Sequence, residues 1–237
     1  MIRVDTVYQK VLALANKEQR GYITPQDFNL FANQAQMEIF EQYFYDVNIA
    51  RKTQGNDTVY SDVDDILEEK LQIFDSVDDG PTIDTYLGPP SNKTLPDYIY
   101  RVYRVEHKDF NCEILNTKDF NDCSKNGLLL KPTNARPIVN IRNNSIRCMI
   151  SNNTLVRPSN IFYFRVPKKV NWTYVVVNKK AMYNAHALTA DFELHPSEEN
   201  QVINKILTLA GVANKQPDIM QAGQGMEMSA KNQQPKI

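Results

Sequence analysis

Apolar residues recur at helical spacing between residues 24 and 46, and the rest of the chain is organised around this segment. The positions that share its apolar face are Phe28, Phe31, Ala35, Ile39, Phe40, Tyr43 and Phe44. Thr24 is a favoured helix cap, Pro25 suits the first helical position, and Asp27 suits the first turn. Further apolar residues lie off this face, so the predicted helix needs packing partners on at least two sides.

The same spacing predicts three more helices. The first covers residues 5–19 and ends before Gly21, which places it in a hairpin with the helix of 24–46. The next starts near Ser61 and presents a face of Val63, Ile66, Leu67, Leu71, Phe74 and Val77, with Asp62, Asp64 and Asp65 expected in its first turn. The last opens at Pro196 and ends before Gly211; His195 is expected to cap it rather than to act as a base.

Between these helices the pattern changes to short apolar runs. Residues 51–60 are polar and predict a loop, and the proline-rich stretch 79–96 predicts a linker. Strands are then predicted at 98–105, 137–141, 146–150, 161–166 and 173–177, with a short helix at 117–124. After Val212 the apolar content falls, which is typical of a flexible tail.

The chain is therefore predicted to be an α+β protein. A helical bundle of three N-terminal helices and one C-terminal helix carries a β-rich insertion and a flexible tail. The expected parts are a helical body at 1–95, the β-rich insertion at 96–192, the packed-back helix at 193–211 and a docking tail at 212–237.

Charge is unevenly distributed along the chain. Residues 1–95 contain 8 basic and 16 acidic residues, whereas residues 96–182 contain 15 basic and 6 acidic residues. Such polarity favours head-to-tail pairing of copies, although independent solvated faces explain it equally well. The three cysteines have no CxxC spacing, which favours a reducing compartment, and no signal sequence or membrane span is predicted.

No motif predicts an enzyme. The chain has no G-x-S-x-G elbow, phosphate-binding loop or dinucleotide fingerprint. His107, Cys112 and Cys123 are too loosely spaced to predict a zinc site. We therefore expect no catalytic residue, no cofactor and no metal.

Residues 157–180 form the one basic stretch with interleaved aromatic residues. It contains Arg165, Lys168, Lys169 and Trp172. The stretch suits a surface near nucleic-acid phosphates, and it also suits strands with aromatic residues inward and basic residues in solvent. Trp172 is expected to be a packing anchor rather than a stacking platform.

Three segments taken together resemble the ring proteins, or head-to-tail adaptors, of crAss-like and related podoviruses. They are GYITPQDFNLFANQAQMEIFEQYFYD at 21–46, FYFRVPKKVNW at 162–172 and DFELHPSEENQVINKILTLAGV at 191–212. The resemblance implies a virion structural protein at the head–tail junction, assembled in the host cytoplasm. It implies a ring of twelve copies beneath the portal, in contact with the portal protein and with a neighbouring ring or tail protein, around genomic DNA.

This resemblance directs attention to interfaces rather than to a catalytic site. The candidate interface residues are Phe40, Tyr43, Arg165, Lys168, Lys169, Trp172, Pro217, Ile219 and Met220. Charged replacements of Phe40 or Tyr43 are expected to leave a folded monomer that cannot close a ring. The alternative function is a nucleic-acid-binding module that uses residues 157–180.

Overall fold

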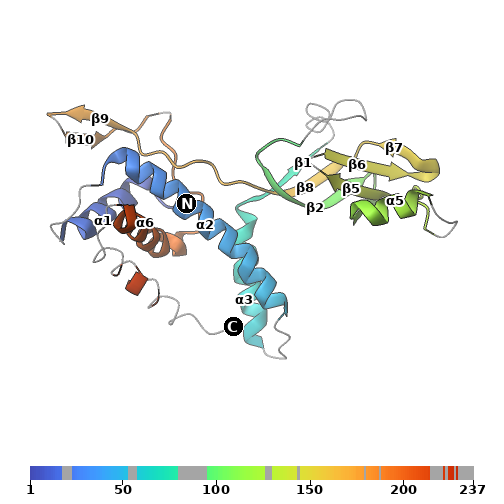
Figure 1. The fold of residues 1–237 in the computed structure, drawn as a ribbon, viewed down its shortest axis with the longest axis horizontal. Coiled ribbons are helices and arrows are strands. Elements are labelled where there is room, and N and C mark those ends of the chain that lie inside the picture. Colours follow the sequence, from blue (N-terminus) through green and yellow to red (C-terminus); the bar gives the residue numbers. More distant parts are fainter. Residues whose placement is uncertain are drawn as a thin grey trace. The chain divides into compact units, whose positions relative to one another are not determined.

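The computed structural model describes residues 1–17, 23–52, 58–79, 95–125, 130–142, 145–178, 180–186, 188–213, 221, 224–226 and 228. The chain contains both helices and sheets and is an α+β protein, as predicted. It divides into two compact units (Figure 1). Unit 1 contains Met1–Ile73 and Pro167–Ile237, and unit 2 is Phe74–Val166. The inserted unit thus differs in both boundaries from the insertion expected at 96–192.

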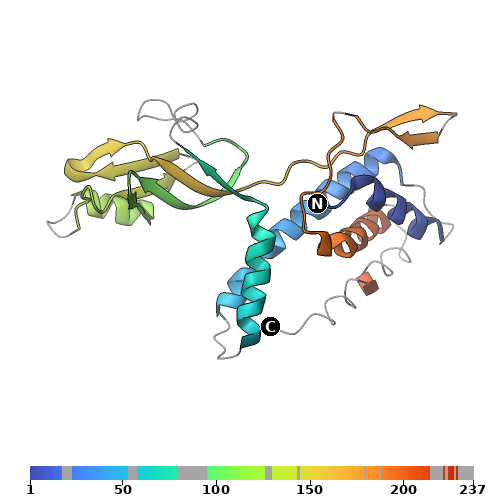
Figure 2. The same ribbon diagram turned by 180° about the vertical axis from the view of Figure 1, so that it is seen from behind.

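Unit 1 is built on helices from both ends of the chain. They are α1 (Val4–Lys17), α2 (Pro25–Lys52), α3 (Thr58–Gln72), the short 3-10 helix η2 (Pro196–Glu198) and α6 (Glu199–Ala213). Helix α6 packs against both α1 and α2, and α3 packs along α2 (Figures 1 and 2). The four helices do not closely match the single bundle expected from the sequence.

Helix α2 starts as its sequence indicates and continues further than expected. The Asp27 amide donates to Thr24 Oγ1 at 3.1 Å, and the Thr24 hydroxyl donates to Asp27 Oδ2 at 2.6 Å. The helix ends at Lys52 rather than near Asp46, so its 28 residues span about 42 Å. The loop predicted at 51–60 was too long, since α2 includes its first two residues and α3 its last three.

The end of α3 also corrects the sequence prediction. The helix stops at Gln72, and Val77 belongs to strand β1 (Asp75–Asp78), which pairs antiparallel with strand β8 (Asn160–Arg165). Ile66 and Val77 are each 51% exposed and do not form a buried helical face. Because α3 begins at Thr58, the aspartates at 62, 64 and 65 also lie beyond its first turn.

The described residues of unit 2 form two four-stranded sheets, one α-helix and one 3-10 helix. The first sheet has the order β1-β8-β2-β3, with β2 at Ile99–His107 and β3 at Phe110–Asn111. The second sheet has the order β4-β5-β6-β7. Its strands are β4 (Glu113–Leu115), β5 (Ile138–Arg142), β6 (Ser145–Ile150) and β7 (Thr154–Val156). The 3-10 helix η1 (Ser151–Asn153) precedes β7. Only β4 and β5 pair in parallel among these described strands. Helix α5 (Thr117–Lys125) confirms the helix predicted at 117–124.

The core of unit 2 is layered. Val105 and Cys112 beside the first sheet pack against Val139 and Cys148 of the second. Successive residues of a strand point to opposite faces, so Ile138 turns away from the first sheet, and Phe120 of α5 packs on it. Unit 2 is therefore a sheet, a second sheet and a helix in three layers.

The first and last residues of unit 2 lie side by side. Strand β1 opens the unit, strand β8 closes it, and Asp75 stands opposite Phe164. Just outside the paired residues, the Arg165 amide donates to the Phe74 carbonyl oxygen at 2.9 Å. The chain thus leaves unit 1 and returns to it at two neighbouring points of unit 2.

After unit 2, the chain returns to unit 1 as an extended segment with one hairpin. The hairpin consists of β9 (Tyr174–Val177) and β10 (Lys180–Tyr183). Isolated bridges pair Asn171 with Ala190 and Ile2 with Phe192. Phe192 and Leu194 are buried, so this segment belongs to the core of unit 1 rather than to the β-rich insertion.

Candidate interaction surfaces and their anchors

Three amide side chains on α2 hold the returning segment by its main chain. Asn29 accepts from the Trp172 amide at 2.8 Å and donates to its carbonyl at 3.2 Å. Asn33 accepts from the Val170 amide at 2.8 Å and donates to its carbonyl at 2.9 Å. Gln36 donates to the Lys168 carbonyl at 2.8 Å. We call Asn29, Asn33 and Gln36 the amide ladder.

The spacing of the amide ladder matches the spacing of an extended chain. Residues four apart on a helix rise by about 6 Å, and alternate residues of a strand advance by about 6.6 Å. Asn29 and Asn33 therefore meet Trp172 and Val170 in antiparallel order. Gln36 comes only three residues after Asn33, and its additional methylene extends its reach; its oxygen also accepts from the Glu193 amide at 3.0 Å. Helix α2 thus takes the place of a neighbouring strand.

Trp172 anchors the base of the hairpin. Its indole N–H donates to Asp5 Oδ1 at 3.1 Å, and its ring lies 4.1 Å from that of Tyr8 between centroids. On its other side it stacks on Tyr174 at 5.7 Å and on Tyr183 at 6.0 Å. Its side chain is buried, so it is a packing anchor and is not available as a stacking platform for a ligand.

The opposite face of the hairpin is apolar and exposed. The strand register puts Val175 beside Met182 and Val177 beside Lys180, on the face away from Tyr174 and Tyr183. Val175, Val177 and Met182 are 44%, 46% and 54% exposed. We call Val175, Val177, Lys180 and Met182 the hairpin face.

Helix α3 has an exposed acidic face. Asp65, Ile66 and Glu69 are all exposed. Glu69 lies three positions after Ile66 and four after Asp65, so both carboxylates border Ile66 on one side of the helix. We call Asp65, Ile66 and Glu69 the acidic face of α3.

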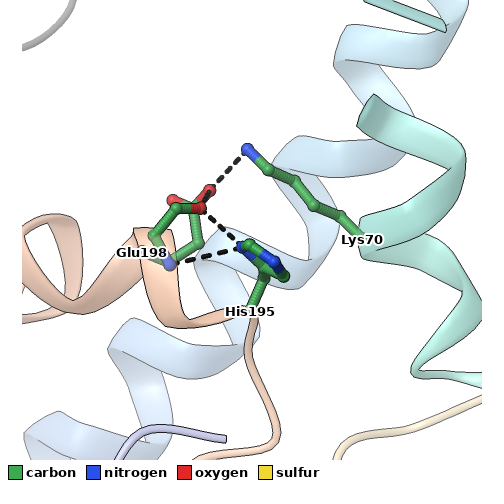
Figure 3. Close-up of polar contacts among 4 residues, drawn as sticks. Lys70, His195 and Glu198 are labelled. Carbon is green, nitrogen blue, oxygen red and sulfur yellow. Dashed lines mark hydrogen bonds and ion pairs between the residues drawn. The ribbon is translucent and has the colours of Figure 1, made fainter. Parts of the chain in front are cut away.

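On its inner side, α3 is tied to the start of α6 by a buried ion pair (Figure 3). Lys70 Nζ lies 2.6 Å from Glu198 Oε1, and both side chains are largely shielded from solvent. The Lys70 ammonium also lies 5.6 Å from the centroid of the Tyr43 ring. Burial, with the nearby negative charge of Glu198, raises the pKa of the Tyr43 hydroxyl far above its ordinary value. The hydroxyl oxygen of Tyr43 has no hydrogen-bond partner among the described residues.

His195 caps η2 next to this ion pair. Its Nδ1 accepts from the Ser197 amide at 3.3 Å and lies 2.8 Å from Ser197 Oγ. The sequence prediction that His195 caps the last helical segment is therefore confirmed. Figure 3 shows its ring directed at the turn that carries Glu198, where it fixes the start of the segment leading into α6.

In unit 2, the outward face of the first sheet gathers aromatic rings around one arginine. The Tyr103 ring lies 5.0 Å from Phe164 and 6.3 Å from Phe162, and the Arg104 guanidinium lies 5.0 Å from the Phe162 centroid. Arg104 is also paired with Glu106. We call Tyr103, Arg104, Phe162 and Phe164 the aromatic sheet face.

Tyrosine hydroxyls on both faces of this sheet donate to aspartates of β1. Tyr103 donates to Asp75 at 2.9 Å, and burial together with this bond raises the pKa of Tyr103 to about 12. On the inner face, Tyr163 and Tyr98 donate to the buried carboxylate of Asp78 at 3.0 and 3.3 Å. These side-chain bonds hold β1 in the sheet in addition to its main-chain pairing with β8.

The structure distributes the expected interface residues among different environments. Phe40 and Tyr43 are buried inside unit 1, so this conformation does not offer them to a second subunit. Residues 157–180 are divided between the two units: Arg165 lies in unit 2, and Lys168 and Lys169 lie in unit 1. Lys168 is 78% exposed along its side chain, and Lys169 is also exposed. Pro217, Ile219 and Met220 lie outside the described residues.

Sequence reasoning missed the amide ladder and the second strand of the hairpin. The ladder was signalled by amides at positions i, i+4 and i+7 of a helix that is otherwise strongly apolar. The hairpin was signalled by Asn178, which has a φ of 50° and begins the two-residue connection between Val177 and Lys180.

Within the described ranges, His, Cys, Asp and Glu side chains form no group of three or more that could hold a metal ion. Cys112 and Cys123 lie in different clusters of the unit 2 core. None of the described helices combines the length and apolar character needed to cross a bilayer. No protein-family model matches the chain, and no curated protein is significantly similar to it.

Proposed function

We propose that the protein is a structural subunit that assembles with copies of itself into a ring, as a head-to-tail adaptor of a tailed bacteriophage. The observation that carries this proposal is the hairpin face. A segment held by the amide ladder and by Trp172 ends in an apolar surface of Val175, Val177 and Met182, whose side chains are about half exposed. Apolar surface presented in this way is typical of a protein–protein contact.

In this proposal the helices of unit 1 form the body of the ring, and unit 2 contacts a neighbouring ring or tail protein. The portal protein binds the other edge, and genomic DNA passes through the lumen. The resemblance of three segments to phage ring proteins supports the assignment to a connector. The ring has twelve copies if the resemblance extends to its symmetry.

Negative-stain electron microscopy of the purified chain tests this function. We expect closed rings, either alone or after addition of the portal protein from the same genome. A chain that stays monomeric at high concentration and does not bind the portal would overturn the proposal. Binding should not require a divalent metal or nucleotide, which dialysis against EDTA checks.

The aromatic sheet face supports a second candidate function, single-stranded nucleic-acid binding. Tyr103, Phe162 and Phe164 offer rings on a sheet surface, and Arg104 adds a cation beside them. Bases stack on such rings, and arginine contributes cation–π contacts. This function predicts affinity that falls steeply with salt and is lost in Tyr103→Ala. Binding that depends instead on Lys168 and Lys169 would assign the function to unit 1.

A further inference from the structure

We propose that the hairpin face of one copy docks on the acidic face of α3 in the next copy. This inference rests on the proposed self-assembly and specifies its contact. The hairpin supplies valines, a methionine and a lysine; α3 supplies an isoleucine bordered on one side by two carboxylates. The occupant of the hairpin face is therefore a second copy of this chain.

The hairpin requires a partner on physical grounds. A two-stranded sheet is marginally stable in water without a further strand or a packed face. One face of this hairpin is packed at its base, through Tyr174 and Tyr183 on Trp172, while Val176 near the turn of that face is 68% exposed. The hairpin face on the other side remains open, and its apolar side chains are about half exposed. A protein surface laid on it would bury the apolar side chains of this second face.

Charge complementarity selects the acidic face of α3 as the acceptor. Lys180 is exposed at the turn of the hairpin. Asp65 and Glu69 carry the opposite charge beside the apolar side chain of Ile66. An apolar centre with a charged rim is the usual anatomy of a contact between proteins. Contacts between two hairpins or between two acidic helices would oppose like charges.

The hairpin face and the acidic face of α3 lie toward opposite ends of helix α2. Asn29 holds the base of the hairpin near the start of α2, and Tyr43 lies under Lys70 of α3. These positions are 14 residues apart, or about 21 Å along the helix axis. Figures 1 and 2 show the hairpin and α3 beside different halves of α2. The surfaces therefore pair between copies, and because they differ, each copy keeps one of each free to continue the series until it closes.

The single contact is small. A hairpin of two four-residue strands covers less than the roughly 800 Å² per partner that a stable pair commonly buries. Two copies alone should therefore associate weakly and less at high salt, because lysines and carboxylates contribute. Ring closure makes the last contact intramolecular and stabilises the whole assembly.

Cysteine cross-linking of full-length chains tests the contact. Met182→Cys protein is mixed with Ile66→Cys protein, alone or with the portal protein, and is oxidised mildly. We expect covalent dimers in the mixture and not in either protein alone. Val176→Cys is the matched control, because Val176 is exposed on the same hairpin as Met182 but on the opposite face. Equal cross-linking of the control would overturn the proposal.

Charged replacements provide the second readout. Val175→Glu should weaken self-association about tenfold or more, and Val176→Glu should change it much less. Lys180→Glu should also weaken it, and combination with Asp65→Lys and Glu69→Lys should restore it. Rings that form without the 182–66 cross-link would overturn this contact and leave the adaptor function standing. A chain without any self-association, alone or on the portal, would overturn both.

Discussion

The side-chain amide of Asn33 accepts from the Val170 amide at 2.8 Å and donates to the Val170 carbonyl at 2.9 Å. A residue on a neighbouring strand would make the same two bonds through its main chain. Val170 is buried, so its amide and carbonyl need partners inside the protein. The main chain of a helix cannot supply these partners, because its own amides and carbonyls are hydrogen-bonded to one another. The side-chain amide supplies a donor and an acceptor instead, and it joins two segments that are 137 residues apart.

Replacement of Asn33 by leucine should therefore destabilise unit 1. Both polar groups of Val170 lose their partner, and each unsatisfied buried group costs about 1–3 kcal/mol, so we expect a loss of about 2–4 kcal/mol. Urea unfolding followed by the fluorescence of Trp172, the single tryptophan, measures it. Gln34→Ala on the exposed side of α2 is the control and should change the stability little. A leucine variant as stable as the parent would show that water or a shifted backbone replaces the amide.

The buried ion pair of Lys70 and Glu198 predicts a second loss. Glu198→Gln leaves the Lys70 ammonium without its counter-charge in a shielded place, and we expect a cost of about 3 kcal/mol. The adjacent exposed pair of Lys10 and Glu199 provides the comparison. Glu199→Gln should cost less than about 1 kcal/mol. Equal losses in the two variants would contradict the importance of burial; denaturant unfolding measures both.

The hydroxyl of Tyr103 predicts a loss of stability at high pH. Burial and the bond to Asp75 raise its pKa in the folded chain to about 12, from the ordinary tyrosine value of about 10. The unfolded chain therefore releases this proton first, so the contribution is complete below about pH 10 and is lost as the pH rises toward 12. The difference in tyrosinate absorbance between the parent and Tyr103→Phe should titrate near pH 12. Asp75→Asn should lower this midpoint, and a midpoint near 10 in the parent would contradict the prediction.

Two cysteines predict a response to oxidation. Cys112 Sγ and Cys148 Sγ lie 3.8 Å apart between the two sheets of unit 2, and the hydrogen bond between the two thiols together with burial raises the pKa of the Cys148 thiol. Diamide should slowly join them, with loss of both thiol hydrogens, and stabilise unit 2 by about 3–4 kcal/mol. Peptide mapping identifies the bond, and Cys148→Ala should abolish it. A disulfide to Cys123 instead would contradict the packing.

The helix starts and several strands were predictable because their signals are local. Thr24 and His195 cap their segments as expected, since a capping side chain needs only the next few residues. The strand predicted at 146–150 differs from β6 by one residue at its start, because its apolar run is bounded by turn residues. Residue propensities and the apolar pattern are sufficient to predict the secondary structure at such positions.

Val77 shows where local signals fail. Its spacing from Leu67 and Leu71 suits a helix, yet pairing with Phe162 on β8 places it in a strand. Such pairing joins residues far apart in the sequence, and no local pattern contains it. The role of Asn33 could not be predicted for the same reason. A side-chain amide on a helix is expected to face solvent unless its partner, here Val170, is known. Phe40 and Tyr43 looked available for assembly only because the segments that cover them could not be placed from sequence.

The adjoining ends of unit 2 have a consequence for how this gene can change. Phe74 and Arg165 are hydrogen-bonded neighbours, so the coding segment for 74–166 can be removed or exchanged in one recombination step without separating the ends that remain. A short glycine bridge in its place should leave Trp172 in its native fluorescence environment. The chain is thus open to acquiring a different middle module while it inherits the same helical frame.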